Sequence, residues 1–358
     1  MRHDEPMNEQ LLRVAIIGYG IGGEVFHAPL VAATPGMQVG YVITSSEARA
    51  ADVRSKYDGA TVLASADELW ARADDIDLVV VTSPNRAHAP QALAAIAAGL
   101  PVVVDKPFAI DVAQAQSVLA AAATANVPIT VFQNRRWDGD FRTITRLLRD
   151  GALGNVTRFE SRFERWRPTP KGGWREIGGT DEAGGLLYDL GAHLIDQALQ
   201  LFGAVSTVYC EMDRRRAGVS TDDDTFVALN HANGVRSHVF MSAVASNLAP
   251  RFRVLGDRAA YVKYGLDVQE DALRDGRRPD LEKAWGAEEQ SRWGNLGTPG
   301  DEQLAPTEPG TYQHFYAAVG AALRGEGDLP VDPRDAIEGL RIIAAAQRSH
   351  RENVVVAL

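Results

Sequence analysis

Asp189 and His193 have the chemistry of a proton-transfer pair. They lie four positions apart within residues 184–196, a stretch that we expect to be helical, so both side chains would point to one face. There a carboxylate can orient an imidazole and stabilise its charge while the ring accepts a proton from a substrate. Taken alone, the two residues could instead be a buried histidine beside a helix cap, so their context has to decide.

Near the N-terminus, six residues have the pattern of a loop that binds a dinucleotide. Gly18, Gly20 and Gly23 form G-x-G-x-x-G, with Tyr19, Ile21 and Gly22 between them. The loop follows an apolar run and opens a helix-like stretch. In that context the glycines allow a tight turn and bring backbone N–H groups close to a pyrophosphate. A plain glycine turn is the alternative, but the context favours a dinucleotide site.

The end of the second apolar run bears on which nicotinamide cofactor binds. An NAD site normally has an acidic residue there for the ribose 2′-hydroxyl, but the nearest acid, Glu47, comes late and falls in the next helix. The residues present bear hydroxyl groups or a positive charge: Thr44, Ser45, Ser46 and Arg49. They suit the 2′-phosphate of NADP, although a helix cap and a solvated arginine would leave the same residues. We expect NADP, with NAD as the second choice.

Short apolar runs alternate with alanine-rich stretches over the first third of the chain. The runs, which we expect to be strands, are 11–17, 37–43, 78–82, 101–104 and 128–132, and the helix-like stretches are 24–33, 46–57, 87–98 and 111–125. Ser46 and Asp111 are suited to cap two of these helices. The alternation predicts a doubly wound parallel sheet, the Rossmann arrangement, over residues 1–133.

Ligands of such sheets bind beyond the carboxyl ends of the strands. Two of the expected strands are followed there by candidate cofactor contacts: Ser83, Pro84, Asn85 and His88 after one, and Asp105, Lys106 and Pro107 after the next. We expect both segments to face the cofactor.

The pattern changes after residue 133. A helix-like stretch, 140–149, precedes alternating polar and apolar residues in 156–165, 205–213, 225–230, 235–243 and 252–255. This alternation predicts an open, mainly antiparallel sheet and thus an α+β domain over residues 134–358. Residues 275–309 are expected to be a long irregular segment held by Trp285 and Trp293. A last helix, near 333–350, would pack back toward the first domain.

Together these segments resemble the glucose-fructose oxidoreductase and inositol dehydrogenase family (Gfo/Idh/MocA). That family usually has Glu-Lys-Pro where this chain has Asp105-Lys106-Pro107, and residues 184–196 resemble its catalytic helix. Within the family the chain is most similar to NADP-dependent scyllo-inositol dehydrogenases, at 25–30, 134–138, 188–196, 264–267 and 269–273. The resemblance implies a cis peptide bond between Lys106 and Pro107. It also implies self-association, as a homodimer or homotetramer, through the open face of the second sheet.

The resemblance further implies reversible hydride transfer between nicotinamide C4 and a secondary alcohol carbon of a cyclitol or sugar. His193 would accept the hydroxyl proton, Asp189 would hold the imidazole, and Lys106 would stabilise the developing alkoxide. Whether Lys106 or His193 is the base stays open. A sugar oxidoreductase that keeps its NADP bound and a non-catalytic sensor of nucleotide or sugar are the alternatives. A sensor has no need of all three residues, which favours an enzyme.

Aromatic and basic residues are interleaved in two segments, with Trp137, Trp166 and Trp174 among Arg136, Arg165, Arg167 and Arg175. Such a pattern can stack bases and bind phosphates of nucleic acid. The formal charge of −10, from 37 basic and 47 acidic residues, argues against nucleic acid and against anionic membranes as partners. A rim that grips a polyhydroxylated substrate is the better interpretation. The candidates for substrate contact are Asn134, Arg136, Trp137, Arg165 and Trp174.

The cysteine content and the distribution of apolar residues indicate the cellular compartment. Cys210, the only cysteine, lies in an alternating run and is interpreted as a buried strand residue. A single cysteine excludes an intrachain disulfide and fits a reducing compartment. The first ten residues lack the apolar core of a signal peptide, and no apolar run is long enough to cross a bilayer. We expect a cytoplasmic protein without a metal site, because the eight histidines show no recognisable ligand spacing.

Overall fold

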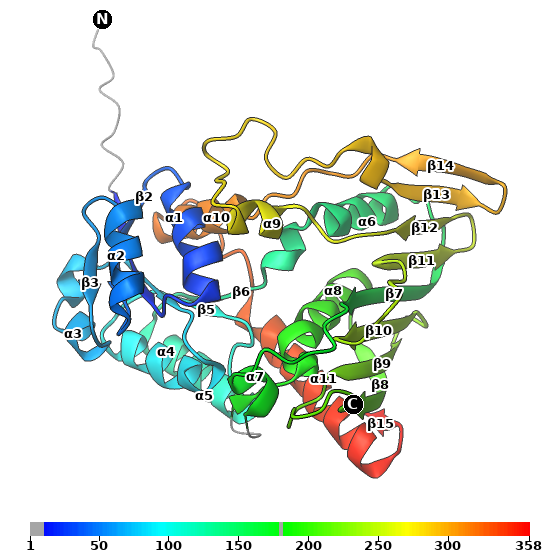
Figure 1. The fold of residues 1–358 in the computed structure, drawn as a ribbon, viewed down its shortest axis with the longest axis horizontal. Coiled ribbons are helices and arrows are strands. Elements are labelled where there is room, and N and C mark those ends of the chain that lie inside the picture. Colours follow the sequence, from blue (N-terminus) through cyan, green and yellow to red (C-terminus); the bar gives the residue numbers. More distant parts are fainter. Residues whose placement is uncertain (1–10, 179–181) are drawn as a thin grey trace, which may run out of the picture.

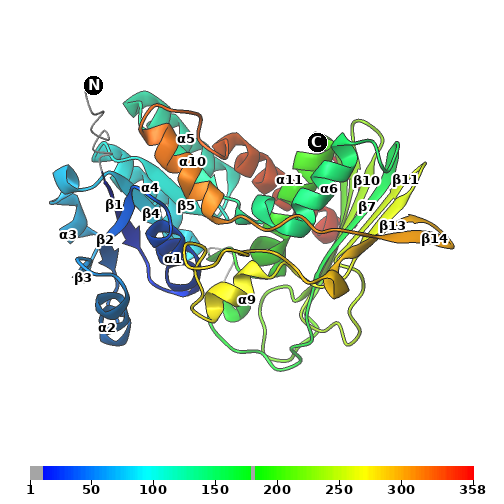
Figure 2. The same ribbon diagram turned by 90° about the horizontal axis from the view of Figure 1, so that it is seen from above.

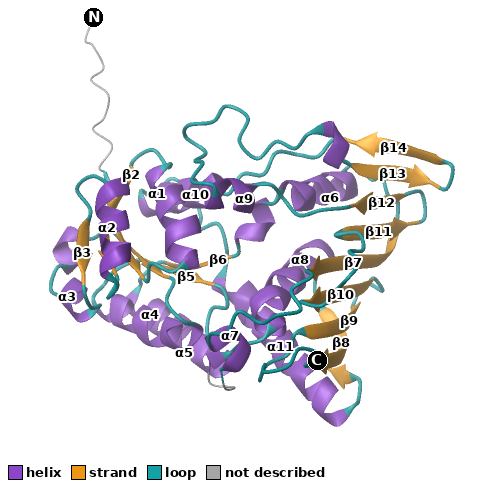
Figure 3. Cartoon of the chain, in the orientation of Figure 1, coloured by secondary structure: helices purple, strands orange, loops and turns teal. Residues whose placement is uncertain are grey.

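Two sheets organise the chain in the computed structural model, which describes residues 11–178 and 182–358. In Figure 1 the first sheet lies on the left and the second on the right, with helices between them. Figure 3 shows the same division by secondary structure, with strands gathered at the two sides. The predicted fold class, a Rossmann sheet joined to a domain on a mainly antiparallel sheet, is confirmed.

The first sheet is parallel throughout, in the order β3-β2-β1-β4-β5-β6. Its strands are β1 (Leu12–Ile17), β2 (Met37–Ile43), β3 (Thr61–Leu63), β4 (Leu78–Val81), β5 (Val102–Asp105) and β6 (Ile129–Phe132). The central strands are apolar along their whole length because helices cover both faces of the sheet. The sequence prediction missed β3, whose three residues are too few to show a period.

The helices of this domain connect the strands by right-handed crossovers, which put α1 and α2 on one face and α4 and α5 on the other. They are α1 (Ala28–Ala32), α2 (Glu47–Lys56), α3 (Asp67–Trp70), α4 (His88–Ala97) and α5 (Val112–Ala125). Both predicted caps are present: Ser46 accepts a hydrogen bond from the N–H of Arg49, and Asp111 accepts one from that of Gln114. A π-helical turn, Gly22–His27, leads from the glycine loop into α1.

The second sheet has the order β14-β13-β12-β11-β7-β10-β9-β8-β15. Its strands are β7 (Val156–Glu164), β8 (Val205–Asp213), β9 (Asp224–His231), β10 (Arg236–Ser242), β11 (Phe252–Gly256), β12 (Ala260–Lys263), β13 (Gly294–Thr298), β14 (Asp301–Ala305) and β15 (Val356–Ala357). Neighbouring strands are antiparallel except β7 and β10, which are parallel, so the sheet is mixed but mostly antiparallel.

The hairpin of β13 and β14 corrects the prediction of an irregular segment over 275–309. It pairs with β12 and extends the sheet. Glycines within and at the tip of the hairpin, together with its exposed polar side chains, hide the alternation that marks a strand. Trp285 does hold the preceding segment, because its buried indole donates to Gln269 at 3.1 Å.

The helices of the second domain are α6 (Gly139–Arg149), α7 (Trp174–Ile177), α8 (Ala192–Phe202), α9 (Gln269–Arg274), α10 (Gln313–Leu323) and α11 (Pro333–Glu352). A π-helical turn, Leu187–Gly191, precedes α8. Figure 2 shows α6 and α11 on the side of the second sheet that faces the first domain, and no helix against its other side. Within the described parts of the chain, no helix combines the length and apolar character needed to cross a membrane.

The end of the chain returns to the first domain. Helix α11 packs against α8 and β8 and also against α5 and β6, while α10 packs against α1. Thr130 of β6 donates a hydrogen bond to the carbonyl oxygen of Val331 at 2.7 Å, and Nδ1 of His27 lies 2.5 Å from the hydroxyl oxygen of Tyr316. The apolar residues of both domains accordingly form one continuous core.

Candidate active site

The glycine loop after β1 is packed tightly against the ends of β4 and β5. At Gly18, where φ is +101°, a Cβ would lie 2.8 Å from the carbonyl oxygen of Thr82. A Cβ at Gly22 would overlap Oγ1 of Thr82 and lie 2.8 Å from Oδ2 of Asp105. At Gly23 it would overlap the carbonyl oxygen of Gly18. Only glycine fits these positions without moving the strand ends.

Gly20, in contrast, faces open space, because a Cβ there would meet nothing within 4 Å. This is the room that an approaching pyrophosphate needs beside the N–H groups of a helix start. Tyr19 offers only its main chain, since its ring is buried and its hydroxyl donates to Asp52 at 3.0 Å. Ile21 exposes 53% of its surface at the start of the π-helical turn. The loop therefore fits a dinucleotide.

At the end of β2, hydroxyl groups and an arginine are accessible, and the nearest acid forms an ion pair at the surface. Thr44 and Ser46 accept backbone hydrogen bonds, and Ser45 is exposed. The carboxylate of Glu47 is 2.8 Å from the guanidinium of Arg54 on the same helix. Arg49 is exposed, and its guanidinium has no ion-pair partner among the described residues. The region thus offers hydroxyl groups and a free cation to a ribose or its phosphate.

The segment after β4 is braced by its own side chains. The ring of His88 contacts two carbonyl oxygens, that of Pro107 at 2.7 Å and that of Ser83 at 2.8 Å. The hydroxyl of Ser83 donates to Gln91 at 2.6 Å. The buried ring of His88 therefore lies between these two carbonyl oxygens and ties the ends of β4 and β5 together, while its contact with a cofactor stays a prediction.

Asn85 has a similar role across the domains. It follows Pro84 at the start of a short helical turn, and its side-chain amide donates to the carbonyl oxygen of Ala183 at 3.1 Å. The adjacent Arg86 forms an ion pair with Glu182. These contacts fasten the strand end to the segment that leads into residues 184–196, and they leave the Asn85 amide committed to the protein.

Asp105 is held by three groups at the end of β5. One oxygen accepts the backbone N–H of Lys106 at 2.8 Å, and the other accepts the hydroxyl of Thr82 at 3.1 Å and lies 3.7 Å from Nε2 of His27. Burial alone would raise the pKa of Asp105, but His27 and Lys106 outweigh it and lower the pKa to about 2. Asp105 is therefore a carboxylate that fixes the backbone of Lys106.

Lys106 reaches across to the second domain. Its ammonium donates to the carbonyl oxygen of Asp189 at 2.5 Å and to Oδ1 of the same residue at 3.1 Å. The peptide bond between Lys106 and Pro107 is cis, as the family resemblance predicts. Although burial would raise the pKa of Asp189, Lys106 and Arg175 lower it well below the usual value. Nε of Arg175 lies 3.6 Å from the same carboxylate.

His193 lies buried at the start of α8, close enough to Lys106 to feel its charge. Its Nδ1 has no hydrogen-bond partner among the described residues, so the expected Asp189–His193 hydrogen bond is absent. The physical reason is the π-helical turn over 187–191, whose wider winding takes Asp189 away from the residue four positions later. Burial first, and then the charge of Lys106, lower the pKa of His193 well below its ordinary value.

Among the candidate substrate contacts, Arg136 is committed elsewhere. Its guanidinium makes a two-pronged ion pair with Asp196, at 2.8 and 2.6 Å, and a further contact with Asp335 at 2.9 Å. This fork joins the segment after β6 to α8 and α11 through Nε and Nη2 of the guanidinium. The structure thus gives Arg136 a role in holding these elements together, and its contact with substrate stays a prediction.

The other candidates differ in their surroundings. Trp137 packs edge-on against Phe315 at 5.5 Å, and Asn134 is buried. Arg165 stacks on a neighbouring phenylalanine ring, and its guanidinium has no acceptor among the described residues. Trp174 carries the guanidinium of Arg175 over its ring at 4.4 Å, so it lies beside the arginine that contacts Asp189.

Comparisons with family models and known proteins identify this arrangement. Residues 12–133 match the model of the oxidoreductase family with an NAD-binding Rossmann fold (GFO_IDH_MocA), and residues 145–358 match that of the family's C-terminal alpha/beta domain. The chain belongs to the Gfo/Idh/MocA oxidoreductase family. The resemblance noted in the sequence is thereby confirmed.

Relatives cover nearly the whole of this Gfo/Idh/MocA chain. It is 39% identical to the uncharacterized oxidoreductase YdgJ of Escherichia coli, over 97% of this chain and 99% of the relative. It is 33% identical to the scyllo-inositol 2-dehydrogenase (NADP(+)) IolW of Bacillus subtilis, over 97% and 96%. Among solved structures, the oxidoreductase YvaA of Bacillus subtilis superposes with a TM-score of 0.90 at 33% identity, over 97% of this chain and 98% of the other.

Sequence reasoning missed Arg135, the neighbour of Arg136. Arg135 is buried, contacts Glu270 at 2.6 Å and Asp138 at 3.4 Å, and its charge also reaches His193. The hydroxyl of Tyr312 donates to Asp138 at 2.6 Å and completes this network. The signal was the pair of consecutive arginines, but only the fold shows which of the two points inward.

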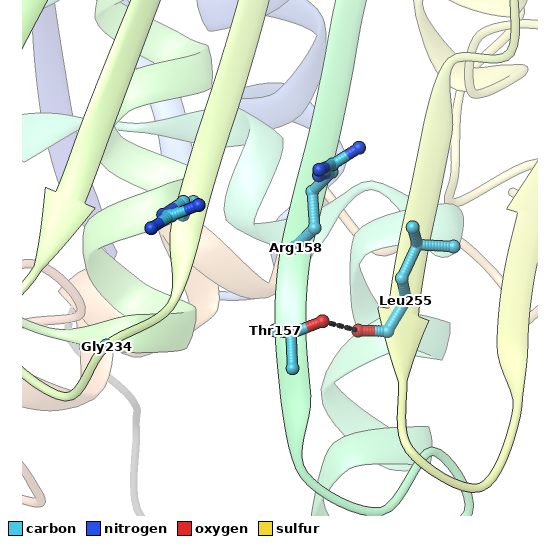
Figure 4. Close-up of a pocket in the computed structure, with 5 residues that line it drawn as sticks. Thr157, Arg158, Gly234 and Leu255 are labelled. Atoms are coloured by element: carbon cyan, nitrogen blue, oxygen red, sulfur yellow. Dashed lines mark hydrogen bonds between the residues drawn. The ribbon is translucent and has the colours of Figure 1, made fainter.

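A hollow elsewhere in this Gfo/Idh/MocA protein is unrelated to these residues. It has a volume of about 360 Å³ and is lined by Thr157, Arg158, Gly234, Arg236 and Leu255 on β7, β11 and the start of β10 (Figure 4). Arg158 is paired in register with Arg236 and Leu255, so all three belong to the helix-free face of the second sheet. The catalytic candidates lie on other elements, and no role in hydride transfer is assigned to this hollow.

Proposed function

We propose that this protein is an NADP-dependent dehydrogenase that transfers hydride between nicotinamide and a secondary alcohol carbon of a cyclitol or sugar, in the manner of scyllo-inositol dehydrogenase. The observation that carries the proposal is the meeting of Lys106, from the end of β5, with Asp189, from the turn before α8. Polar groups from a cofactor-binding sheet and from a second domain converge there, as a site at a domain junction requires. The name of the relative IolW supports the substrate class.

When bound, the nicotinamide would supply the hydride chemistry, and the protein supplies proton handling and charge. The ammonium of Lys106 has three N–H donors. Two of them are directed at the carbonyl oxygen and the carboxylate of Asp189. The third remains for the oxygen of the substrate alcohol, whose developing negative charge it stabilises. Asp189 therefore acts by aiming Lys106.

His193 is suited to accept the hydroxyl proton. Its lowered pKa keeps the imidazole neutral, and so able to accept a proton, at neutral and mildly acidic pH. The positive charge of Lys106 opposes a full positive charge on the ring and so disfavours the protonated state of His193. We assign the base to His193 and the alkoxide contact to Lys106.

The preference for NADP over NAD rests on the end of β2. Arg49 and Ser45 are exposed there, and the nearest acid, Glu47, lies in α2 and not at the end of β2. A 2′-phosphate would find a cation and a hydroxyl, whereas a 2′-hydroxyl would find no acid at the end of the strand.

We also propose self-association through the helix-free face of the second sheet. Phe226 and Phe240 stack there with ring centres 4.8 Å apart, and the guanidinium of Arg162 lies 4.4 Å above the ring of Phe240. These half-buried aromatic rings would be covered by the same face of another copy. Light scattering should give a dimer or tetramer, and Phe240→Glu should yield monomers. Leu281→Glu, at a residue 74% exposed elsewhere, is the matched control.

Turnover tests the function itself. The protein would be incubated with NADP⁺ or NAD⁺ and with scyllo-inositol, myo-inositol and common aldoses, and reduced nicotinamide followed by absorbance. Formation of NADPH with at least one polyol, lost in Lys106→Met and His193→Ala, is the expected result. Tight NADP⁺ binding without turnover on any polyol or its ketone would instead favour the sensor.

A further inference from the structure

Arg165, just after β7, is a partly buried arginine with unused donors. Its main-chain N–H donates to the carbonyl oxygen of Ser242 at 2.8 Å, and its guanidinium carbon lies 4.7 Å from the centre of the Phe163 ring. None of its guanidinium nitrogens has an acceptor among residues 11–178 and 182–358. Burial, and then the like charge of Arg167, lower the pKa of Arg165. A partly desolvated cation in this state is stabilised by an anion.

Asp189, the first carboxylate whose charge reaches Arg165, is already occupied. Its Oδ1 is 3.1 Å from Nζ of Lys106 and 3.6 Å from Nε of Arg175. Asp189 is thus already paired with Lys106 and Arg175 and is not an ion-pair partner of Arg165.

Glu270, the second carboxylate that acts on Arg165, is also occupied. It lies 2.6 Å from the guanidinium of Arg135 and 2.8 Å from that of Arg274. Neither acid can therefore neutralise Arg165 as well. Among the described residues, no carboxylate is paired with Arg165.

We propose that the substrate carries an anionic group, a carboxylate or a phosphate, and that Arg165 binds it beside Lys106 and Asp189. This inference rests on the proposed function, because it takes the substrate to be a polyhydroxylated alcohol bound at that site. The planar guanidinium matches two oxygens of a carboxylate or phosphate at once, which a hydroxyl group cannot offer. Arg175, held over Trp174, is the second cation within reach of such a group.

A neutral cyclitol would satisfy the hydrogen bonds of Arg165 but not its charge. It would leave the guanidinium of Arg165 without a paired anion, with Arg165 and Lys106 both lowering the pKa of His193. An anionic substrate would pair with Arg165 and raise the basicity of His193 when it binds. The substrate class therefore shifts from plain cyclitols toward sugar acids and sugar phosphates.

Binding of matched ligands tests the inference without turnover. Calorimetry, with and without saturating NADP⁺, would compare D-glucose with D-glucuronate and with D-glucose 6-phosphate. At least one anion should bind about tenfold or more tightly than glucose, and added salt should weaken only the binding of anions. The arm that binds better, uronate or phosphate, identifies the acidic group. Equal binding of all three ligands would overturn the inference.

Two variants locate the contact. Arg165→Gln should weaken binding of the preferred anion about 30-fold or more and leave that of glucose within about threefold. Arg149→Gln removes the same charge from an exposed arginine at the end of α6, which is not among the charges acting on Arg165, and should change neither. Arg165→Lys keeps the charge without the planar fork and should recover part of the affinity. Anion binding that is unchanged in both Arg165 variants would show that another group is responsible.

Kinetics separate this inference from the proposed function. If neutral polyols are oxidised as well as anionic ones and Arg165→Gln does not alter their kcat/KM, the function stands and the anionic substrate is wrong. If the anion binds through Arg165 but no hydride is transferred to or from any ligand, the anion site stands and the dehydrogenase assignment is wrong.

Discussion

Nζ of Lys106 lies 3.1 Å from Oδ1 of Asp189, although 83 positions separate the two residues in sequence. The contact joins the end of a Rossmann strand to the turn before α8. Asp189 consequently contacts Lys106 and not, as its spacing indicated, His193.

The first prediction follows from the contact between Lys106 and Asp189. Lys106→Met should lower kcat about 100-fold or more, because it removes the cation that stabilises the alkoxide. Asp189→Asn should cost less on its own, and almost nothing further in the Lys106→Met background, since its target is already gone. In the His193→Ala background, Asp189→Asn should keep its full effect. A double-mutant cycle on kcat decides, and equal coupling of Asp189 to both partners would contradict the assignment.

A second prediction concerns the protonation of His193. The pKa of His193 is lowered by burial and by Lys106, so the ring should stay neutral below the pH at which an ordinary histidine, near 6.5, becomes charged. Since a depressed pKa rises when a neighbouring cation is removed, Lys106→Met should move the pKa of His193 upward. NMR titration of the imidazole measures this. The signal of His231, whose ring is held by Gly203 and Ser237, is the internal control and should not move.

Gly20 and Gly22 should respond differently to the same substitution. Gly22→Ala forces a Cβ against Thr82 and Asp105 and should destabilise the fold by about 1–3 kcal/mol. Gly20→Ala meets no protein atom and should leave thermal stability unchanged. It should nevertheless weaken NADP⁺ binding about tenfold or more, a loss of about 1.4 kcal/mol, by blocking the approach of the pyrophosphate. Unimpaired NADP⁺ binding by a folded Gly20→Ala protein would remove the loop from the cofactor site.

Cofactor preference should depend on Arg49. Arg49→Ala is expected to weaken NADP⁺ binding about tenfold to 100-fold, the range for a hydrogen bond to a charged group, while NAD⁺ binding stays the same. Fluorescence titration with both nucleotides measures the two affinities. Arg72→Ala, another exposed arginine of the first domain, is the control and should change neither. A uniform loss for both nucleotides in Arg49→Ala would mean that its contact is not with the 2′-phosphate.

Arg136 should matter for stability more than for affinity. Arg136→Ala strips the buried carboxylate of Asp196 of its partner, and removing one member of a buried pair costs about 3–5 kcal/mol. Denaturant unfolding should show this loss. KM for a confirmed substrate should stay nearly constant in the folded fraction. A large rise in KM with little change in stability would restore Arg136 to the substrate rim.

Most of the first domain could be predicted from the sequence, because apolar strands and helix caps are local patterns. Ser46 and Asp111 cap helices as predicted, since a side-chain oxygen followed three residues later by a free N–H is sufficient for a cap. β3 and the hairpin of β13 and β14 escaped prediction because one is too short and the other too polar to show a period.

The candidate site was harder to predict than the fold, because its geometry depends on one irregular helical turn and on the tertiary packing of two adjacent arginines. The spacing of Asp189 and His193 indicates a shared helix face only if the helix is regular, and the π-helical turn breaks that assumption. Arg135 and Arg136 are adjacent and chemically alike, so only tertiary packing separates the one near His193 from the one bound to Asp196. Local sequence carries neither kind of information.

Because α10 and α11 pack against the first domain, the nucleotide-binding domain cannot be exchanged as residues 1–133 alone. Tyr316 holds His27, and the main chain at Val331 receives the hydroxyl of Thr130. A chimaera cut after residue 133 would remove these supports from the π-helical turn that follows the glycine loop and from the edge strand β6. A chimaera that includes residues 312–332 together with residues 1–133 would keep the contacts of Tyr316 and Val331 with the nucleotide-binding domain.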